Sequence, residues 1–274
     1  MNKHARFTLL VLVFVLACAS LPEPTPTASP VPEATFTPSP TNTPTPDPTS
    51  TPDTPATAAA AATQTAGNLL TDLDKLLGGS DLPYQEGYLA WRYDDPIEVS
   101  MTGPDSKLIG IDEKLISGNF VLKSEVTWNA TGIIVCGVIF RSEPDLVKGR
   151  QYQFLFLRLS GLPAWAIEFH EFGYFKNSPT NVQYSSALDQ GNNATNEFVL
   201  VAYEDQFTMF LNGIRQGRFF DYSKQSAEGN FAFLGSQDSG EGTCTYENSF
   251  IWSMDPINLN PTTWTDQTDR VFRS

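Results

Sequence analysis

The sequence predicts an all-β fold, a two-sheet antiparallel sandwich, between residues 84 and 255. Short segments of alternating apolar character are rich in Val, Ile, Phe, Tyr and Trp, and turn residues separate them. No long helical pattern interrupts these segments. The region has roughly 170 residues, which is the length of one domain, and so many short strands in it favour two packed sheets.

Residues 1–17 have the pattern of an export signal. Lys3 and Arg6 precede the apolar residues 7–16, a run too short to span a membrane as a helix. The run closes in Val15-Leu16-Ala17-Cys18, which resembles a bacterial lipobox. The resemblance implies cleavage before Cys18, lipidation of that cysteine, and an extracytoplasmic protein anchored to the bacterial membrane. An ordinary secretory signal that happens to contain a cysteine is the alternative.

Residues 18–66 form a Pro/Thr-rich segment that cannot build a packed core. Frequent prolines favour extended polyproline II structure of about 3.1 Å per residue, so the segment could reach on the order of 100 Å. We expect a disordered linker behind the lipid anchor.

A short stalk helix is predicted over residues 67–79. Gly78-Gly79 would end it. Its leucines are spaced to line one face: Leu69, Leu70, Leu73, Leu76 and Leu77. A dimerising coiled coil is the alternative, but fewer than two heptads are present.

The sandwich strands are predicted from period-2 alternation. They are Phe120 to Trp128, Ile133 to Arg141, Gln151 to Leu159, Ala164 to Phe169, Glu197 to Glu204, Gln206 to Leu211, Phe231 to Gly235 and Tyr246 to Met254. In the first strand, alternation directs Phe120, Leu122, Val126 and Trp128 toward the other sheet. Asn212-Gly213 favours a type I′ hairpin turn, because both positions tolerate positive φ. Residues 256–274 are expected to be a polar C-terminal tail.

The charge balance excludes one class of partner. The chain has 31 acidic and 17 basic residues and a formal charge of −14. An acidic surface repels phosphates, so we expect no nucleic-acid partner, whereas neutral sugars and cations are tolerated.

Five segments and two single residues carry a family resemblance: Asn119 to Leu122 with Trp128, Gly137 to Arg141, Asn196 to Ala202, Phe210 to Gly213, Asp221, Gly229, and Glu247 to Trp252. In this order they resemble the concanavalin A-like lectin/glucanase superfamily, including its laminin-G-like and 3-keto-disaccharide-hydrolase-type modules. The resemblance covers about residues 85 to 255 and implies a jelly-roll sandwich. It implies an activity less firmly, because core and turn residues carry it.

A catalytic centre of the glucanase type is not evident. The resemblance implies two carboxylates on alternate residues of one strand. The alternating pairs Asp72/Asp74 and Glu143/Asp145 lie outside the predicted strands. A carbohydrate-binding module is therefore the first interpretation. The alternatives are a glycoside-processing enzyme and a module that binds a protein or another cell-surface ligand.

The strand from Gln151 to Leu159 suggests where a ligand would bind. Leu155, Leu157 and Leu159 are predicted to face the core, which puts the other set of side chains on the ligand face. Together with neighbours in the sequence, the candidate groove residues are Arg141, Tyr152, Phe154, Arg158, Trp165 and His170. The alternative is that both faces are packed and that these residues are structural.

Cys136 and Cys244 remain in the folded region once Cys18 is assigned to the anchor. They form either a disulfide, which suits an exported protein, or two buried thiols on separate strands. Sequence alone does not decide between these two states.

The sequence allows calcium but requires no cofactor. Asp238-Ser239-Gly240-Glu241 and Asp205 offer oxygen ligands in loops. Their spacing matches no defined calcium loop, and a solvated acidic loop is the alternative.

Overall fold

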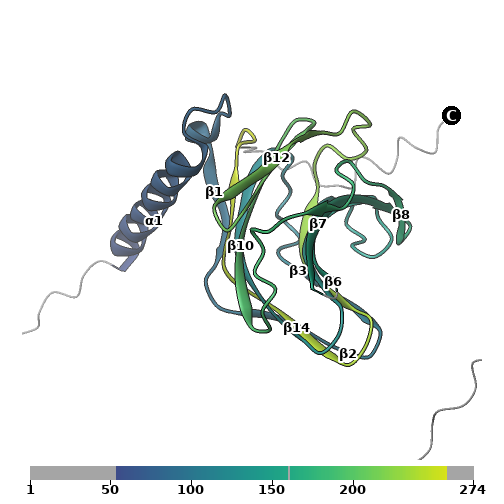
Figure 1. Cartoon of the computed structure of the whole chain (residues 1–274). Helices are drawn as coiled ribbons and strands as arrows, with labels where there is room; N and C mark the ends of the chain where they lie inside the picture. The colour runs from purple at the N-terminus through teal and green to yellow at the C-terminus, as the bar shows by residue number, and fades with distance from the viewer. Residues whose placement is uncertain (1–53, 160, 258–274) are drawn as a thin grey trace, which may run out of the picture. The chain divides into compact units, whose positions relative to one another are not determined.

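The computed structural model describes residues 54–159 and 161–257. Its elements are one α-helix, one 3₁₀ helix and fourteen strands (Figure 1). The helices are α1 (Thr54–Leu77) and η1 (Tyr84–Glu86). The strands are β1 (Tyr88–Tyr93), β2 (Ile97–Thr102), β3 (Asp105–Gly110), β4 (Phe120–Ala130), β5 (Ile134–Ser142), β6 (Gln151–Leu159), β7 (Leu162–Glu171), β8 (Tyr174–Asn177), β9 (Gln183–Tyr184), β10 (Ala194–Tyr203), β11 (Gln206–Leu211), β12 (Ile214–Phe220), β13 (Asn230–Gln237) and β14 (Glu241–Ser253). Within these residues, no helix has the length and apolar character needed to cross a membrane.

The strands form two seven-stranded antiparallel sheets. The first sheet has the order β1-β14-β4-β10-β11-β12, with β2 also paired to β14. The second has the order β3-β13-β5-β6-β7-β8, with β9 also paired to β7. The predicted all-β, two-sheet jelly-roll sandwich is therefore confirmed.

The main core fills the space between the two sheets. Phe120, Leu122, Val126 and Trp128 of β4 are all buried in it, as their alternation predicts. Aromatic rings dominate the packing, for example Phe120 against Phe231 with ring centroids 4.8 Å apart. Each large apolar side chain that is fully buried contributes about 1.5–3 kcal/mol.

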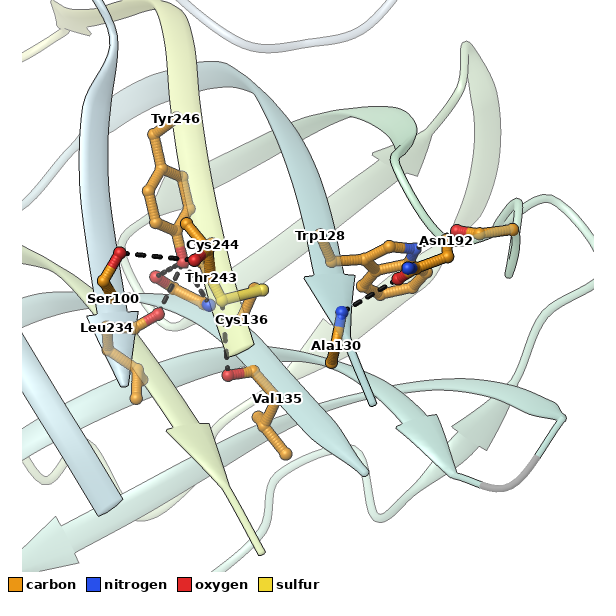
Figure 2. Close-up of a disulfide and its surroundings, with 12 residues drawn as sticks. Ser100, Trp128, Ala130, Val135, Cys136, Asn192, Leu234, Thr243, Cys244 and Tyr246 are labelled. Atoms are coloured by element: carbon orange, nitrogen blue, oxygen red, sulfur yellow. Dashed lines mark hydrogen bonds between the residues drawn. A yellow bond between two sulfur atoms is a disulfide. The ribbon is translucent and has the colours of Figure 1, made fainter. Parts of the chain in front are cut away.

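A disulfide joins the two sheets inside this core (Figure 2). Cys136 of β5 and Cys244 of β14 have Cα atoms 5.7 Å apart, and neither is exposed. The hydroxyl of Tyr246, beside the bridge, accepts a hydrogen bond from the Gly137 amide at 2.7 Å and donates to the Leu234 carbonyl at 2.5 Å. The bridge and the tyrosine thus tie β14 to β5 and β13 of the second sheet.

Helix α1 differs from the predicted stalk over residues 67–79. It begins at Thr54, inside the segment predicted to be linker, because alanines that favour helix precede the leucines. Its Leu73 and Leu77 are buried against the outer face of the first sheet, where they meet Val199 and Trp252. The predicted end is confirmed, since the Gly78 amide donates to the Asp74 carbonyl at 2.9 Å and closes the last turn.

The predicted hairpin at Asn212-Gly213 is confirmed, with φ of 48° and 74° between the paired Leu211 and Ile214. Strands β1, β2, β3, β8, β9 and β12 were not predicted. The export signal, Cys18, the linker before residue 54 and most of the C-terminal tail lie outside the described residues.

Candidate functional site

A groove lies on the outer face of the second sheet, the face turned away from the core. Its volume is about 910 Å³, within the range of small-molecule sites. Strands β6 and β7 supply four of its polar side chains, β2, β3 and β13 line the opposite side, and Leu146 and Gly173 form part of its rim. In Figure 1 this sheet runs from β3 through β6 and β7 to β8.

The register of β6 and β7 brings four polar side chains together. Gln151 pairs with His170 and Gln153 pairs with Glu168. Directly paired residues share a face of the sheet, so all four point into the groove, and all four line it.

The hydrogen bonds of these side chains differ. His170 Nε2 lies 2.9 Å from Glu168 Oε2, and the Gln151 side-chain oxygen accepts a bond from the Ser142 hydroxyl at 3.0 Å. Among the described residues, the half-buried amide of Gln153 has no hydrogen-bond partner. A planar amide with free donors and an acceptor, beside a carboxylate and an imidazole, is suited to binding hydroxyl groups.

An exposed aromatic ring stands next to this cluster. Phe175 of β8 pairs with His170, and the two rings meet edge to face with centroids 6.1 Å apart. Phe175 is 55% exposed. An exposed aromatic ring therefore stands beside the polar end of the groove, just outside its lining.

The floor of the groove is apolar. Leu155 and Leu234 line it, and with Ile139 and Ala232 they form a small cluster on the outer face of the sheet. Leu146, from the loop between β5 and β6, packs against this cluster. It packs close to Gly110 at the end of β3, where a Cβ would lie 3.3 Å from a methyl group of Leu146, slightly closer than an ordinary van der Waals contact.

The groove is close to neutral although the chain is strongly acidic. Its charged lining consists of Glu98, Glu168 and Lys107. The formal charge of the whole chain is −14. The groove therefore favours an uncharged ligand over an anion or a polycation.

Of the six residues predicted to line a groove, only His170 does so. Tyr152, Phe154 and Trp165 are at most 1% exposed and belong to the core between the sheets. The hydroxyl of Tyr152 donates to the Asp221 carboxylate, so the tyrosine is a structural residue. Burial, together with this carboxylate, raises the pKa of Tyr152.

The two arginines are also structural. Arg141 is 3% exposed, and its guanidinium donates twice to the Gly118 carbonyl, at 2.9 and 2.6 Å. Arg158 donates to the Gln190 and Ala130 carbonyls, at 2.9 and 3.1 Å. Both hold loops at the ends of the sandwich, and neither lines the groove.

The prediction for β6 failed because both of its faces are apolar. Phe154 and Phe156 face the core, whereas Leu155 and Leu157 face the small outer cluster. Alternation alone then cannot say which set is inside. The two glutamines at the start of the strand were the available signal, since both fall on the outer face.

The residues considered for calcium do not come together. Asp238 accepts a bond from the Ile133 amide at 3.0 Å beyond the end of β4, whereas Asp205 pairs with Lys224 at 3.4 Å. The Glu204 amide, next to Asp205, binds Asn119 at the start of β4. Across residues 54–159 and 161–257, no group of three or more His, Cys, Asp or Glu side chains could hold a metal ion.

The groove face of β7 bears on catalysis as well. Its alternate positions carry Glu168 and His170, a carboxylate and an imidazole in contact, rather than two carboxylates. The other carboxylate in the described lining, Glu98, comes from β2 of the first sheet.

No protein-family model matches the chain, and no curated protein sequence matches it. Among solved structures, the chain is similar to a carbohydrate-binding module (CBM66) from Bacillus subtilis, with 16% identity, a TM-score of 0.43, and coverage of 59% of this chain and 92% of that one. It is similar to a Bacillus licheniformis β-glucanase, with 9% identity, a TM-score of 0.40, and coverage of 58% and 79%. It is also similar to sheep galectin-11, with 12% identity, a TM-score of 0.37, and coverage of 55% and 98%. The groove itself, and not this distant likeness, carries the functional proposal.

Proposed function

We propose that this protein is a lipid-anchored surface module that binds a neutral carbohydrate in the groove of its second sheet. The observation that carries the proposal is the unpartnered amide of Gln153 beside the Glu168–His170 pair, with Phe175 exposed next to them. Sugars present hydroxyl groups at their edges and apolar C–H groups on their ring faces. Planar hydrogen-bonding groups next to an aromatic ring match both parts.

The anchoring part of the proposal is supported by the sequence. Val15-Leu16-Ala17-Cys18 ends an apolar run of signal-peptide length. Lipidation of Cys18 would tether the sandwich by the Pro/Thr-rich linker. The variant Cys18→Ser should move the protein from the membrane fraction to the soluble extracytoplasmic fraction, and unchanged membrane association would contradict the anchor.

Binding is tested by calorimetry against a panel of neutral oligosaccharides and soluble polysaccharides. The variant Gln153→Ala should weaken binding about tenfold, because one or two hydrogen bonds at roughly 1 kcal/mol each are lost.

A matched control is Gln216→Ala. Gln216 is a half-buried glutamine on β12 of the first sheet, and its amide donates to the Ile214 carbonyl. This change should leave affinity unaltered. The proposal fails if no glycan in the panel binds, or if the two variants have equal effects.

A further inference from the structure

A second cavity lies at the side of the sandwich, between β1 and β3. Its volume is about 570 Å³. Apolar and aromatic side chains supply most of its lining, chiefly Trp91, Tyr93, Ile97 and Ile109, and Asp112 is the charged residue among them. A mostly apolar lining with few polar groups is typical of ligand sites.

Two aromatic rings form one wall of this aromatic cavity. Trp91 and Tyr93 lie in planes only 12° apart, with ring centroids separated by 6.2 Å. Trp91 is held from behind by the core residue Phe233, at 6.4 Å between centroids. Tyr93 is 43% exposed. The wall is therefore a fixed pair of nearly parallel rings that solvent can reach.

The aromatic cavity and the groove share part of their lining. Ile109 lines both spaces directly. An intermediate cavity of about 820 Å³ at the end of β3 shares Gly110 and Asp112 with the aromatic cavity and Leu146 with the groove. Because β3 is the edge strand of the second sheet, the path from the groove to the aromatic cavity would run around this edge, beside β2, which contributes residues to the lining of both spaces.

We propose that Trp91 and Tyr93 form a second subsite that stacks on further sugar rings of the glycan held in the groove. This inference rests on the proposed function and adds the ligand class: a saccharide chain long enough to reach from the Gln153 cluster around β3, rather than a monosaccharide or disaccharide. Asp112, which lines the aromatic cavity and the intermediate cavity, supplies a hydrogen-bond acceptor for hydroxyl groups along the way.

A second ring pair shows that stacking alone does not define such a site. Phe220 and Tyr222 also lie nearly parallel, 17° apart with centroids at 5.9 Å, and Tyr222 is 83% exposed. Neither residue lines the groove, the intermediate cavity or the aromatic cavity. This pair serves as the control.

The test measures affinity by calorimetry for a disaccharide and a hexasaccharide of the β-1,3- and β-1,4-linked glucose series. Four proteins are compared: wild type, Tyr93→Ala, Tyr222→Ala and Gln153→Ala. Tyr93→Ala should weaken hexasaccharide binding about tenfold, the upper range for a lost aromatic contact. It should leave disaccharide binding within about twofold, because Gln153 and Tyr93 line different spaces.

The controls separate this inference from the proposed function. Gln153→Ala should weaken both ligands, and Tyr222→Ala neither. The second subsite is refuted if Tyr93→Ala affects the hexasaccharide no more than Tyr222→Ala does while Gln153→Ala still weakens binding. If the wild-type protein binds none of the sugars, the proposed function fails for this ligand series and the subsite fails with it. Tyr93 lies half-exposed at the end of β1, so the core does not depend on its ring.

Discussion

Loss of the Cys136–Cys244 bridge should cost the sandwich a large part of its stability. The perturbation is the double variant Cys136→Ala/Cys244→Ala. Both this variant and its reference protein carry Cys18→Ser, so the bridged pair is the only pair of cysteines in the reference protein. The cysteines are 108 residues apart, a loop for which chain entropy gives about 4.8 kcal/mol at 25 °C. For a domain of this size, Tm falls by about 3 °C for each kcal/mol lost from the free energy of unfolding, so Tm should fall by about 14 °C.

Differential scanning calorimetry measures this fall, and the wild-type protein supplies two controls. Both sulfur atoms are buried, so a phosphine reductant added to the folded protein should leave Tm unchanged. Protein reduced in denaturant and then refolded keeps both sulfur atoms but lacks the bond, which separates loop entropy from lost packing. A fall in Tm of less than about 4 °C for the refolded, reduced protein would refute the chain-entropy reasoning.

Two further predictions concern α1 and the loop that carries Leu146. Leu77→Ala should lower the free energy of unfolding by about 2–5 kcal/mol in a urea titration, because the leucine is buried against the first sheet, whereas Lys75→Ala on the exposed side should cost less than about 1 kcal/mol. In the loop, burial raises the pKa of Glu143, but hydrogen bonds from the Arg150 amide and guanidinium outweigh this effect and leave the pKa lowered. Hydrogen bonds that the Val147 and Lys148 amides donate to Asp145 lower the pKa of Asp145 as well. Lowered carboxyl pKa values stabilise the folded loop at neutral pH, and this stability is lost as the pH falls below about 4. Amide hydrogen exchange in the loop should therefore become faster below about pH 4. Asp145→Asn should make it faster already at pH 7. Exchange that is unchanged between pH 7 and pH 3, after correction for the intrinsic rate, would contradict this prediction.

The sequence was informative where one face of a strand is apolar and the other polar. Residues Phe120 to Trp128 carry a clear alternation, and their inward set is buried as predicted. Strand β8 was missed because all four of its residues are exposed, so burial imposes no period on it. An edge strand of this kind is held by pairing with a neighbouring strand, and the sequence of the strand itself does not show that pairing.

The candidate site was harder to predict than the fold. His170 was recognised as a candidate, but its partners depend on the register of β6 and β7 and on the β7–β8 hairpin. A register irregularity next to His170 decides that Phe175, and not a neighbouring residue, stands beside it. Gln153 differs from an ordinary surface glutamine only by its position in the groove.

Strand β14 has a consequence for the order in which the sandwich can fold. It is the last strand in the described residues, yet it lies inside the first sheet, where it pairs with β1, β2 and β4 and carries one half of the disulfide. Until β14 has emerged, β1 and β2 have no partner in that sheet and the bridge cannot form. Folding that waits for such distant pairings is slow. Under the proposed export of this chain, the delay would keep the sandwich open, and therefore able to pass through a membrane, until nearly all of the sandwich has been made.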